Sequence, residues 1–353
     1  MTVSIPMAGL NASGGVKTLV LLANAMANRG WAVRVLVPEY ASHGPSALAP
    51  AVERLVLRTP TNRLTRVPVY YARLARHAAR DADLCLANFY LTAYCALLSR
   101  LANRRAKVVY FVQGDEASSH GRLAEGGVLS RTVRWTLARL SYRLPVRIIC
   151  VSRWLRGRIG RPDARVVSQG LDLDVFAPRR HRSGGEVVIG TIGSSAAAKG
   201  YGDFRCALEL LPEAARAGVR VIVAAPASVP LPQGVITERV ETSSETGMSA
   251  FYNRCDIFVF ASRSEGFGLP PLEAMACGCA VVTTDCGGVR DYVEAERNAR
   301  MVAPGEPREL AAAIADLISD CSQRERLAAA ALVTGRARGR DEMIAEFIDA
   351  VTV

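Results

Sequence analysis

The sequence predicts an α/β protein of two domains, and three observations support this prediction. The chain has 353 residues, which is more than one hydrophobic core usually serves. Half of the residues are apolar and 22% are charged, a balance typical of globular proteins. Short apolar segments alternate with helical patterns, which is the rhythm of parallel β-α-β units.

The first half of the chain contains one complete series of such units. Its apolar, β-branched segments are expected to be strands because these residues suit a buried sheet. The strands are predicted at 3–7, 32–37, 84–87, 108–112 and 147–151, with helices at 16–28 and 131–143. This series predicts a first Rossmann-like domain over residues 1–175.

The same rhythm restarts in the second half, after a polar, turn-forming segment at 176–185 that is expected to be a linker. Strands are predicted at 187–191, 221–224, 257–261 and 280–283, with helices at 203–211, 271–277 and 307–319. A second Rossmann-like domain is therefore expected over 186–338. The last segment, 339–353, predicts a helix whose amphipathic face must pack somewhere, and the first domain is one candidate.

The charges are divided unevenly between the two halves. Residues 1–182 carry 28 Lys and Arg against 10 Asp and Glu, whereas residues 183–353 carry 16 against 23. The first domain is therefore expected to attract an anionic membrane surface or a phosphorylated acceptor, with nucleic acid less favoured. Its arginine runs at 54–80 and 131–165 alternate with apolar residues, as a basic amphipathic surface does. Arginines that merely decorate solvated faces are the alternative.

The nine cysteines lie mostly in apolar stretches, so buried thiols are expected. Cys277, Cys279 and Cys286 lack the matching pair or the histidines of a zinc site, so no metal site is predicted. No signal peptide is visible, and every apolar run is shorter than the roughly 18 to 20 residues of a spanning helix. We therefore expect a cytoplasmic protein that can meet the inner membrane face through its basic domain.

The strongest chemical signal is a segment that places two carboxylates, Glu265 and Glu273, eight residues apart across a glycine-rich turn. Gly266 and Gly268 lack side chains, so backbone N–H groups can approach a ligand closely. The prolines that follow suit the start of a helix, whose N-terminus attracts anions. Glu273 is expected in the first turn of that helix, able to accept paired hydrogen bonds from vicinal hydroxyls. The segment follows a strand, at the edge where open α/β sheets bind ligands.

This Glu-x7-Glu segment, with Gly-Phe-Gly-Leu-Pro inside it, resembles the hallmark of the retaining glycosyltransferases of family 4, the glycosyl transferases group 1. The resemblance extends to the strand and Gly-Gly turn at 279–288 and to the interdomain turn at 169–172. In the first domain it rests on Gly14-Gly15 before a helix. It implies the GT-B fold, in which two Rossmann-like domains face each other across a cleft.

Carried over by position, the resemblance implies a site for a nucleotide-diphosphate sugar. Glu273 would bind the ribose, and Lys199, in the loop at 193–200, would be the cation on the diphosphate. Glu265 would hold the donor sugar. The remaining donor-side residues are the backbone groups and side chains of Gly14, Gly15, Ser194, Gly266, Phe267, Gly268 and Leu269. Lys199 is one of only three lysines in the chain, so lysine is not its default surface cation.

The chain departs from the family pattern at two positions. Ser194 stands where the family usually has a phosphate-binding arginine. The family also often has a histidine at the end of one first-domain strand. In this chain that strand is followed by Gln113, Gly114, Asp115 and Glu116, so no catalytic histidine is assigned. Asp115 is the candidate for the wall of the reaction site, with Glu116 as its alternative.

The resulting prediction is a retaining hexosyltransferase that needs no metal and no resident cofactor, because fixed positive groups stabilise the departing diphosphate. Its acceptor is expected to be a glycan, a glycolipid or a small hydroxyl compound. A sugar-nucleotide epimerase and a catalytically silent partner in glycan assembly are the alternatives. A dehydrogenase is disfavoured because Gly9, Gly14 and Gly15 lack the Gly-x-Gly-x-x-Gly spacing.

Overall fold

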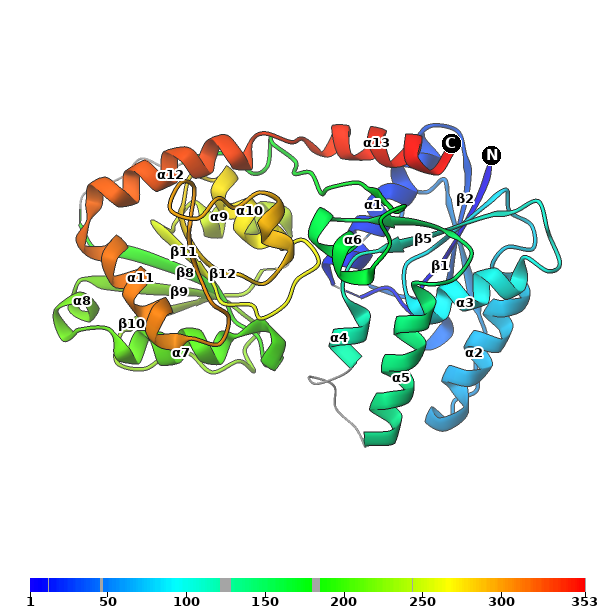
Figure 1. The fold of residues 1–353 in the computed structure, drawn as a ribbon, viewed down its shortest axis with the longest axis horizontal. Coiled ribbons are helices and arrows are strands. Elements are labelled where there is room, and N and C mark those ends of the chain that lie inside the picture. The colour runs from blue at the N-terminus through cyan, green and yellow to red at the C-terminus, as the bar shows by residue number, and fades with distance from the viewer. Residues whose placement is uncertain (12, 45–46, 121–127, 180–184, 243, 353) are drawn as a thin grey trace. The chain divides into compact units, whose positions relative to one another are not determined.

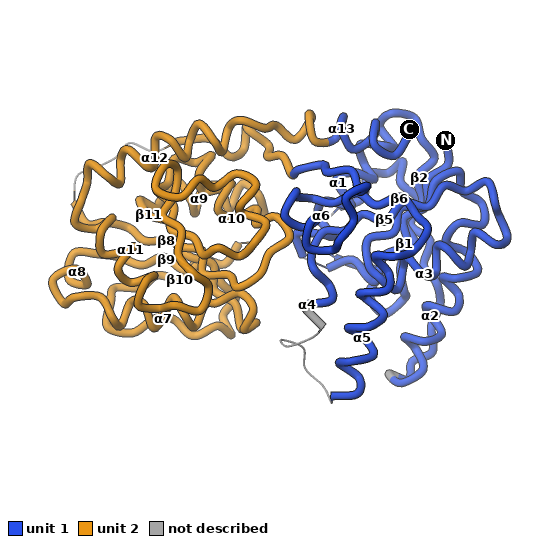
Figure 2. Tube along the Cα trace, in the orientation of Figure 1, with its two compact units in different colours: residues 1–168, 344–353 blue, residues 169–343 orange. Residues whose placement is uncertain are grey.

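The computed structural model describes residues 1–11, 13–44, 47–120, 128–179, 185–242 and 244–352. Contacts divide the chain into two compact units (Figure 2). Unit 1 consists of Met1–Ser168 together with Ile344–Val353, and unit 2 of Gln169–Met343. The expected linker, 176–185, begins inside unit 2, and its residues 180–184 lie outside the described part of the chain.

Unit 1 contains one parallel sheet of seven strands in the order β3-β2-β1-β4-β5-β6-β7 (Figure 1). The central strands β4 and β5 are buried almost throughout, which explains their continuous apolar sequences. The strands are β1 (Thr2–Pro6), β2 (Ala32–Pro38), β3 (Val52–Leu57), β4 (Leu84–Ala87), β5 (Lys107–Val112), β6 (Arg147–Cys150) and β7 (Arg165–Val166).

Helices connect these strands as a parallel sheet requires. They are α1 (Gly14–Asn28), the short η1 (Glu39–Ala41), α2 (Arg63–His77), α3 (Tyr90–Ser99), α4 (Glu116–His120), α5 (Val128–Ser141) and α6 (Arg153–Ile159). The last helix of the chain, α13 (Arg340–Thr352), joins unit 1 from Ile344 onward. Its Phe347 packs against Phe111 of β5 with ring centroids 4.9 Å apart. The final helix therefore belongs largely to the first domain, as its amphipathic sequence allowed.

Unit 2 repeats the architecture with six parallel strands in the order β10-β9-β8-β11-β12-β13. The strands are β8 (Val187–Ile192), β9 (Val219–Ala224), β10 (Ile236–Val240), β11 (Ile257–Phe260), β12 (Ala280–Thr284) and β13 (Arg300–Val302). The helical elements are η2 (Ala197–Lys199), α7 (Tyr201–Leu210), α8 (Glu213–Ala217), α9 (Glu245–Tyr252), α10 (Leu269–Ala276), η3 (Gly288–Asp291), α11 (Pro307–Ser319) and α12 (Cys321–Gly335). A buried core forms where α7, α11 and α12 meet β8, β9, β11 and β12.

Both sheets begin 3-2-1-4-5-6, the Rossmann order, so the predicted fold class is confirmed. Each predicted strand is present, within two residues at either end. The sequence analysis missed β3, β7, β10 and β13, because such lateral strands are only partly buried and carry charged residues. Seven of the nine cysteines are buried free thiols, as expected. Among the described residues, none of the helices has the length and apolarity to cross a membrane.

Candidate functional site in unit 2

The predicted donor-binding residues of unit 2 gather at the carboxyl edge of its sheet. Strands β8 and β11 are parallel neighbours, so the loops that follow them emerge side by side. Two hydrogen bonds join these loops at the same carbonyl: the Arg263 amide donates to Ala198 O over 2.8 Å, and the Ser262 hydroxyl over 3.2 Å. The loop that carries Lys199 is therefore fixed to the loop that carries Glu265.

Lys199 and Glu265 form an ion pair, with 2.8 Å between Lys199 Nζ and Glu265 Oε1. Ser262 Oγ donates to the same carboxylate oxygen over 2.7 Å. The lysine side chain is half exposed, whereas the glutamate side chain is only 17% exposed. The ammonium can therefore reach a ligand from solvent while the carboxylate stays anchored. Sequence reasoning placed both residues in one site, and the structure brings them into direct contact.

Glycines make this close packing possible. Gly200 follows Lys199 with φ +64°, and a Cβ there would lie 1.8 Å from the carbonyl oxygen of Ala261. Gly288, in the turn after β12, would place a Cβ 2.4 Å from the backbone of Gly266. Gly268 has φ +84° and stands at the N-cap of α10. Three backbone segments thus converge at distances that any side chain would prevent.

Two contacts with Tyr292 fix the start of α10. Phe267 is buried against Tyr292 with ring centroids 5.2 Å apart, and the Tyr292 hydroxyl donates to Gly268 O. Since the Phe267 side chain is committed to the core, only its backbone remains for a ligand. Leu269 begins the helix, two residues before the predicted start, and two prolines follow in its first turn. The amides of this turn therefore present the positive end of the helix to the sheet edge.

Glu273 differs from its predicted position. The helix begins at Leu269, so Glu273 is its fifth residue, and no acidic side chain lies in the first turn. The prediction was wrong because the helix starts two residues earlier than its proline pair suggested. The Glu273 carboxylate accepts a hydrogen bond from the buried Tyr252 hydroxyl over 2.8 Å. Burial raises the pKa of Tyr252 well above its ordinary value, so this hydroxyl remains a donor.

Ser194 lies in the loop between β8 and η2, where its hydroxyl accepts a hydrogen bond from the Ala196 amide over 3.2 Å. It shapes the loop before Lys199 but brings no positive charge. An arginine does stand nearby: Arg263, next to the shared loop contact, forms a bidentate ion pair with Asp203 at 2.8 and 2.9 Å. That guanidinium serves the structure of the loop.

In unit 1 the predicted residues meet at the corresponding edge of the other sheet. Gly14 and Gly15 form the first turn of α1, capped by Ser13. Gln113, in the loop after β5, donates its side-chain amide to Gly15 O over 3.1 Å, and a Cβ on Gly15 would approach Gln113 Oε1 to 3.2 Å. The glycine turn is thus tied to the loop that contains Asp115.

Asp115 is buried, and its carboxylate is engaged within unit 1. Arg158 of α6 donates to Oδ2 over 2.9 Å, and the Ser118 hydroxyl and amide also donate to the carboxylate. The neighbouring Glu116 accepts hydrogen bonds from the Tyr90 amide over 2.8 Å and the Tyr110 hydroxyl over 3.1 Å. Burial raises the pKa of Glu116 to about 8. Both carboxylates have a structural function, and a part for Asp115 in chemistry stays a prediction.

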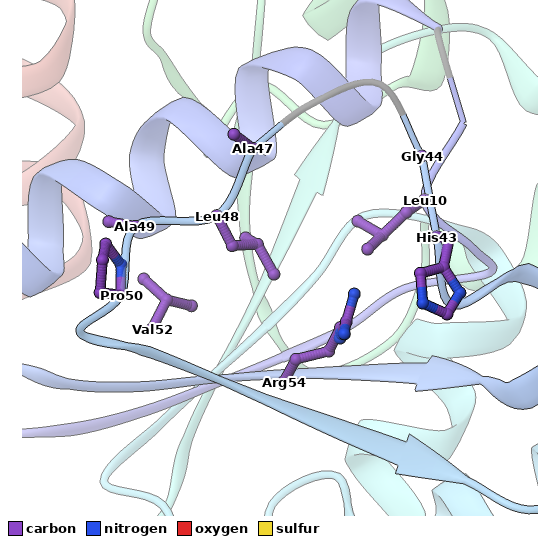
Figure 3. A pocket seen from close by; sticks show the side chains of 9 residues that line it. All are labelled: Leu10, His43, Gly44, Ala47, Leu48, Ala49, Pro50, Val52 and Arg54. Atoms are coloured by element: carbon purple, nitrogen blue, oxygen red, sulfur yellow. The ribbon is translucent and has the colours of Figure 1, made fainter.

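Unit 1 also contains a cavity of about 380 Å³ near the junction of α1 and β3 (Figure 3). Seven of its nine lining residues are apolar or glycine, with Leu10, Leu48 and Val52 among them, and the other two are His43 and Arg54. Sequence reasoning did not identify this cavity, because Leu10 is far in the sequence from the other lining residues, which lie between positions 43 and 54.

Sequence reasoning did not identify the two residues whose hydroxyls donate hydrogen bonds to the predicted carboxylates, Ser262 and Tyr252. Ser262 stands three residues before Glu265 in the quoted segment, so the sequence itself pointed toward it. Tyr252 precedes Glu273 by 21 residues on another helix, and only the tertiary structure reveals their contact.

Two family models match the chain, one over each predicted domain. Residues 12–175 match the model described as Glycosyltransferase Family 4, and residues 186–320 match that described as Glycosyl transferases group 1. Together these ranges include every predicted site residue.

Curated relatives match shorter stretches. A D-inositol 3-phosphate glycosyltransferase of Xylanimonas cellulosilytica is 35% identical over 29% of this chain and 24% of its own length. A lipopolysaccharide core biosynthesis mannosyltransferase of Rhizobium leguminosarum bv. viciae is 29% identical over 44% of this chain and 49% of its own. The chain thus spans about a quarter to a half of the length of these relatives.

Solved structures match the whole chain. Sucrose-phosphate synthase from Thermosynechococcus elongatus has a TM-score of 0.79 at 16% identity, covering 99% of this chain and 98% of that one. HepE from Anabaena, in complex with UDP and glucose, has a TM-score of 0.72 at 19% identity, covering 100% and 99%. At these identities the likeness establishes the fold alone, which is the predicted pair of Rossmann-like domains of the GT-B class.

Proposed function

The chain belongs to glycosyltransferase family 4, and on that premise we propose that it moves a sugar from a nucleotide-diphosphate sugar to an acceptor hydroxyl. The observation that carries this proposal is the Lys199–Glu265 pair at the carboxyl edge of the unit 2 sheet, beside the N-terminus of α10. A cation, a carboxylate and a helix N-terminus are the groups that a sugar diphosphate needs. HepE, which shares the fold, has been solved with UDP-glucose, and this agrees with such a donor.

Each group has a defined task in this proposal. Lys199 contacts the diphosphate, and its release from Glu265 frees the carboxylate to accept hydrogen bonds from the sugar hydroxyls. Ser262 keeps Glu265 in place during this exchange, because its hydroxyl bonds the same oxygen. Glu273 binds the ribose hydroxyls, and Tyr252 orients it from the core. Lys199 exchanges one anionic partner for another in this step, whereas the carboxylate exchanges the ammonium for neutral hydroxyl donors and keeps its hydrogen bond from Ser262.

The reaction breaks the bond between the anomeric carbon and the β-phosphate oxygen, so negative charge grows on the diphosphate. Once Lys199 has moved from Glu265 to the diphosphate, it and the first-turn amides of α10 stabilise this charge as the bond breaks. We propose that they do so without a metal. Family membership supports retention of the anomeric configuration, with the acceptor attacking from the face that the diphosphate leaves.

The acceptor is assigned to unit 1 in this proposal. The cavity offers the guanidinium of Arg54 beside apolar side chains, and unit 1 as a whole is strongly basic. A glycolipid or a phosphorylated hydroxyl compound combines the anionic and apolar parts that this cavity fits. The relatives named above are a glycosyltransferase of inositol 3-phosphate and a lipopolysaccharide mannosyltransferase, which agrees with acceptors of this chemistry.

Thermal-shift screening against UDP-, GDP-, ADP- and dTDP-sugars tests the donor site directly. A ligand at 100 times its Kd stabilises the folded protein by about 2.7 kcal/mol, which is readily measured. Glu273→Ala should weaken the binding of that nucleotide sugar by about 1 to 3 kcal/mol, whereas Glu265→Gln should reduce turnover more than binding. Equal and negligible effects of both variants would refute the site.

Product analysis separates the remaining possibilities. A transferase releases the nucleoside diphosphate when the sugar moves to an acceptor hydroxyl or to water, whereas an epimerase isomerises the donor sugar and releases no nucleoside diphosphate. A protein that binds the nucleotide sugar but never turns it over would be a silent partner in glycan assembly.

A further inference from the structure

Arg66, near the start of α2, has a positive charge that its surroundings in unit 1 do not neutralise. Its guanidinium lies over the ring of Tyr40, with 4.6 Å between Cζ and the ring centroid. Within the described residues, no hydrogen bond or ion pair engages this side chain, and its Nε is buried without a partner. Burying a donor without an acceptor costs free energy, so such a group in a folded protein requires an explanation.

The position of Arg66 on α2 places its charge at the carboxyl edge of the unit 1 sheet. Tyr40, which contacts it, lies in η1, directly after β2. One turn after Arg66, the Tyr70 hydroxyl donates to Met7 O and lies 3.3 Å from Leu36 O. Residues four apart share a helix face, so Arg66 lies on the side of α2 that faces the carboxyl ends of β1 and β2. Open α/β sheets bind their ligands at this edge.

Tyr40 is held in place by the packing of its turn against the loop that follows β1. The Leu10 amide donates to Ala41 O over 2.9 Å, and a Cβ on Gly9 would lie 2.7 Å from that of Ala41. Partial burial raises the pKa of Tyr40, although Arg66 opposes the shift, so the hydroxyl stays protonated. This hydroxyl has no hydrogen-bond partner in the part of the chain that the structure describes. Ring and guanidinium therefore form a preorganised pair with free donors.

The acid nearest to Tyr40 in the sequence is engaged elsewhere. The Glu39 carboxylate accepts a hydrogen bond from the Thr59 amide over 3.1 Å, so it holds the loop after β3 and not Arg66. A second arginine reaches the same turn from β3, where Arg54 Nη1 donates to Ser42 O over 3.2 Å. The turn thus has two arginines close by and no carboxylate paired with either of them. Its electrostatic character favours an anion.

We propose that Arg66 and Tyr40 bind the phosphate group of a phosphate monoester. The terminal nitrogens of a guanidinium match two phosphate oxygens in one plane, and the ring beneath keeps that plane fixed. The Tyr40 hydroxyl adds a neutral donor. A phosphate monoester carries nearly two negative charges at neutral pH, which suits a turn with two arginines. Phosphate binding here does not depend on sugar transfer, whereas a phosphate on the acceptor rests on the proposed function.

Titration calorimetry on the full chain tests the site. The probes are glycerol 3-phosphate, glycerol as the uncharged comparison, and dihexanoyl phosphatidic acid, which carries the same phosphate on a lipid. All titrations use a Lys199→Gln background, so that the cation of the donor site cannot bind the phosphate in unit 2. We expect glycerol 3-phosphate to bind and glycerol not to bind. The tighter of the two phosphate compounds then identifies the source of the group as soluble or lipid, and either source supports the site.

Variants assign the binding to the proposed pair. Arg66→Gln should weaken the binding of glycerol 3-phosphate by about tenfold or more, because two charge-assisted hydrogen bonds are lost. Arg66→Lys should weaken it by about fivefold, since an ammonium keeps the charge but not the planar pair of donors. Arg76→Gln is the matched control. It removes the same charge from an exposed position about 15 Å further along α2, so the change should stay within about twofold.

The melting temperature without ligand separates binding from a structural contribution. Arg66→Gln removes a stacking contact but also an unsatisfied buried donor, so its Tm should stay close to that of the parent protein. Tyr40→Leu removes the ring and should weaken phosphate binding by about fivefold. A stack that only supports the fold would lower the Tm in both variants and leave phosphate affinity unchanged.

Three outcomes would overturn the proposal. The first is an absence of phosphate binding in the Lys199→Gln background. The second is an equal loss of affinity in Arg66→Gln and Arg76→Gln, which would indicate attraction by net charge alone. The third is phosphate affinity that Arg66→Gln and Arg66→Lys leave intact. None of these outcomes bears on the donor site, which the nucleotide-sugar thermal shift tests separately in the wild-type protein.

Discussion

The two units have the same sheet order but place different chemistry at the carboxyl edges of their sheets. In unit 2, short loops with glycines bring Lys199 and Glu265 together beside a helix N-terminus. In unit 1, the corresponding loops tie Asp115 to Arg158 and surround Glu116 with tyrosines. The comparison shows that the Rossmann order provides an edge where loops converge, and that the sequences of these loops determine which chemical groups lie there.

The units also differ in net charge and in the ion pairs that their arginines form. Unit 1 carries 25 Lys and Arg against 10 Asp and Glu, whereas unit 2 carries 19 against 23. Several arginines of unit 2 are in ion pairs, such as Arg263 with Asp203 and Arg290 with Asp285. Helices α2 and α5 of unit 1 contain no acidic residues that could form ion pairs within the helix. In the proposed function, unit 2 binds the donor and the basic unit 1 receives an anionic acceptor.

The largest expected effect concerns the part of the last helix, from Ile344 onward, that belongs to unit 1. Phe347→Ala removes a buried ring that packs on Phe111 of β5 and should destabilise unit 1 by about 4 kcal/mol. Hydrogen exchange should accelerate in β5 and β6 but not in β8 and β9. Phe204→Ala, at a buried position of unit 2, should produce the opposite pattern. Equal acceleration of exchange in both units would show that they unfold together and would contradict the expectation that each unit has its own stability.

The next effect sharpens the contrast between the two sheet edges. Lys199→Gln removes the one lysine of the unit 2 site and should lower turnover by about 10² to 10³-fold, because the departing diphosphate loses a fixed positive charge. Steady-state kinetics with the sugar nucleotide identified by thermal shift would measure it. Arg254→Gln removes another cation of unit 2, paired with Glu238 at 2.5 Å, and should leave turnover within about twofold. Similar losses in both variants would contradict the assignment.

Glu116 offers a pH-dependent test of unit 1. Its pKa is raised from 4.5 to about 8 by burial, so the folded state holds a proton that the unfolded state releases near pH 4.5. Stability therefore falls as the pH rises between these two values, since the folded protein binds more protons there. Between about pH 6 and about pH 9, the wild-type protein should lose about 2.7 kcal/mol more than Glu116→Gln.

Urea unfolding at the two pH values measures this difference. Glu213→Gln, at an exposed position of α8 in unit 2, is the control and should show the wild-type dependence on pH. If Glu116→Gln has that same dependence, the carboxyl is not protonated in the folded protein.

The smallest expected effect concerns the support of Glu273. Tyr252→Phe deletes the hydroxyl that donates to Glu273 and should weaken nucleotide binding by about 1 kcal/mol, close to fivefold. Titration calorimetry would detect it. Tyr201→Phe also deletes one hydrogen bond of unit 2, to Pro230 O at 2.8 Å, and should not change nucleotide affinity. A loss of affinity in Tyr201→Phe alone would place the nucleotide elsewhere.

Much of the fold could be predicted from the sequence because central parallel strands have a strong local signature. β4 and β11 are short apolar runs that are buried on both faces, and their predicted ranges agree with the structure within one residue. β10 was missed since its lateral position leaves it half exposed, with Thr, Glu and Arg in its sequence. Burial determines which residues a strand can carry, so a lateral strand has no distinctive composition.

For the site, the sequence by itself determined the residues that lie close together along the chain. The glycine turn, Glu265 and the nearby Ser262 form one local segment whose spacing already indicates a loop between a strand and a helix. Tertiary structure decided the contacts between distant segments: Lys199 with Glu265, Tyr252 with Glu273, and Phe347 with Phe111. The physical reason is that local patterns set backbone conformation, whereas the packing of whole strands and helices sets which side chains meet.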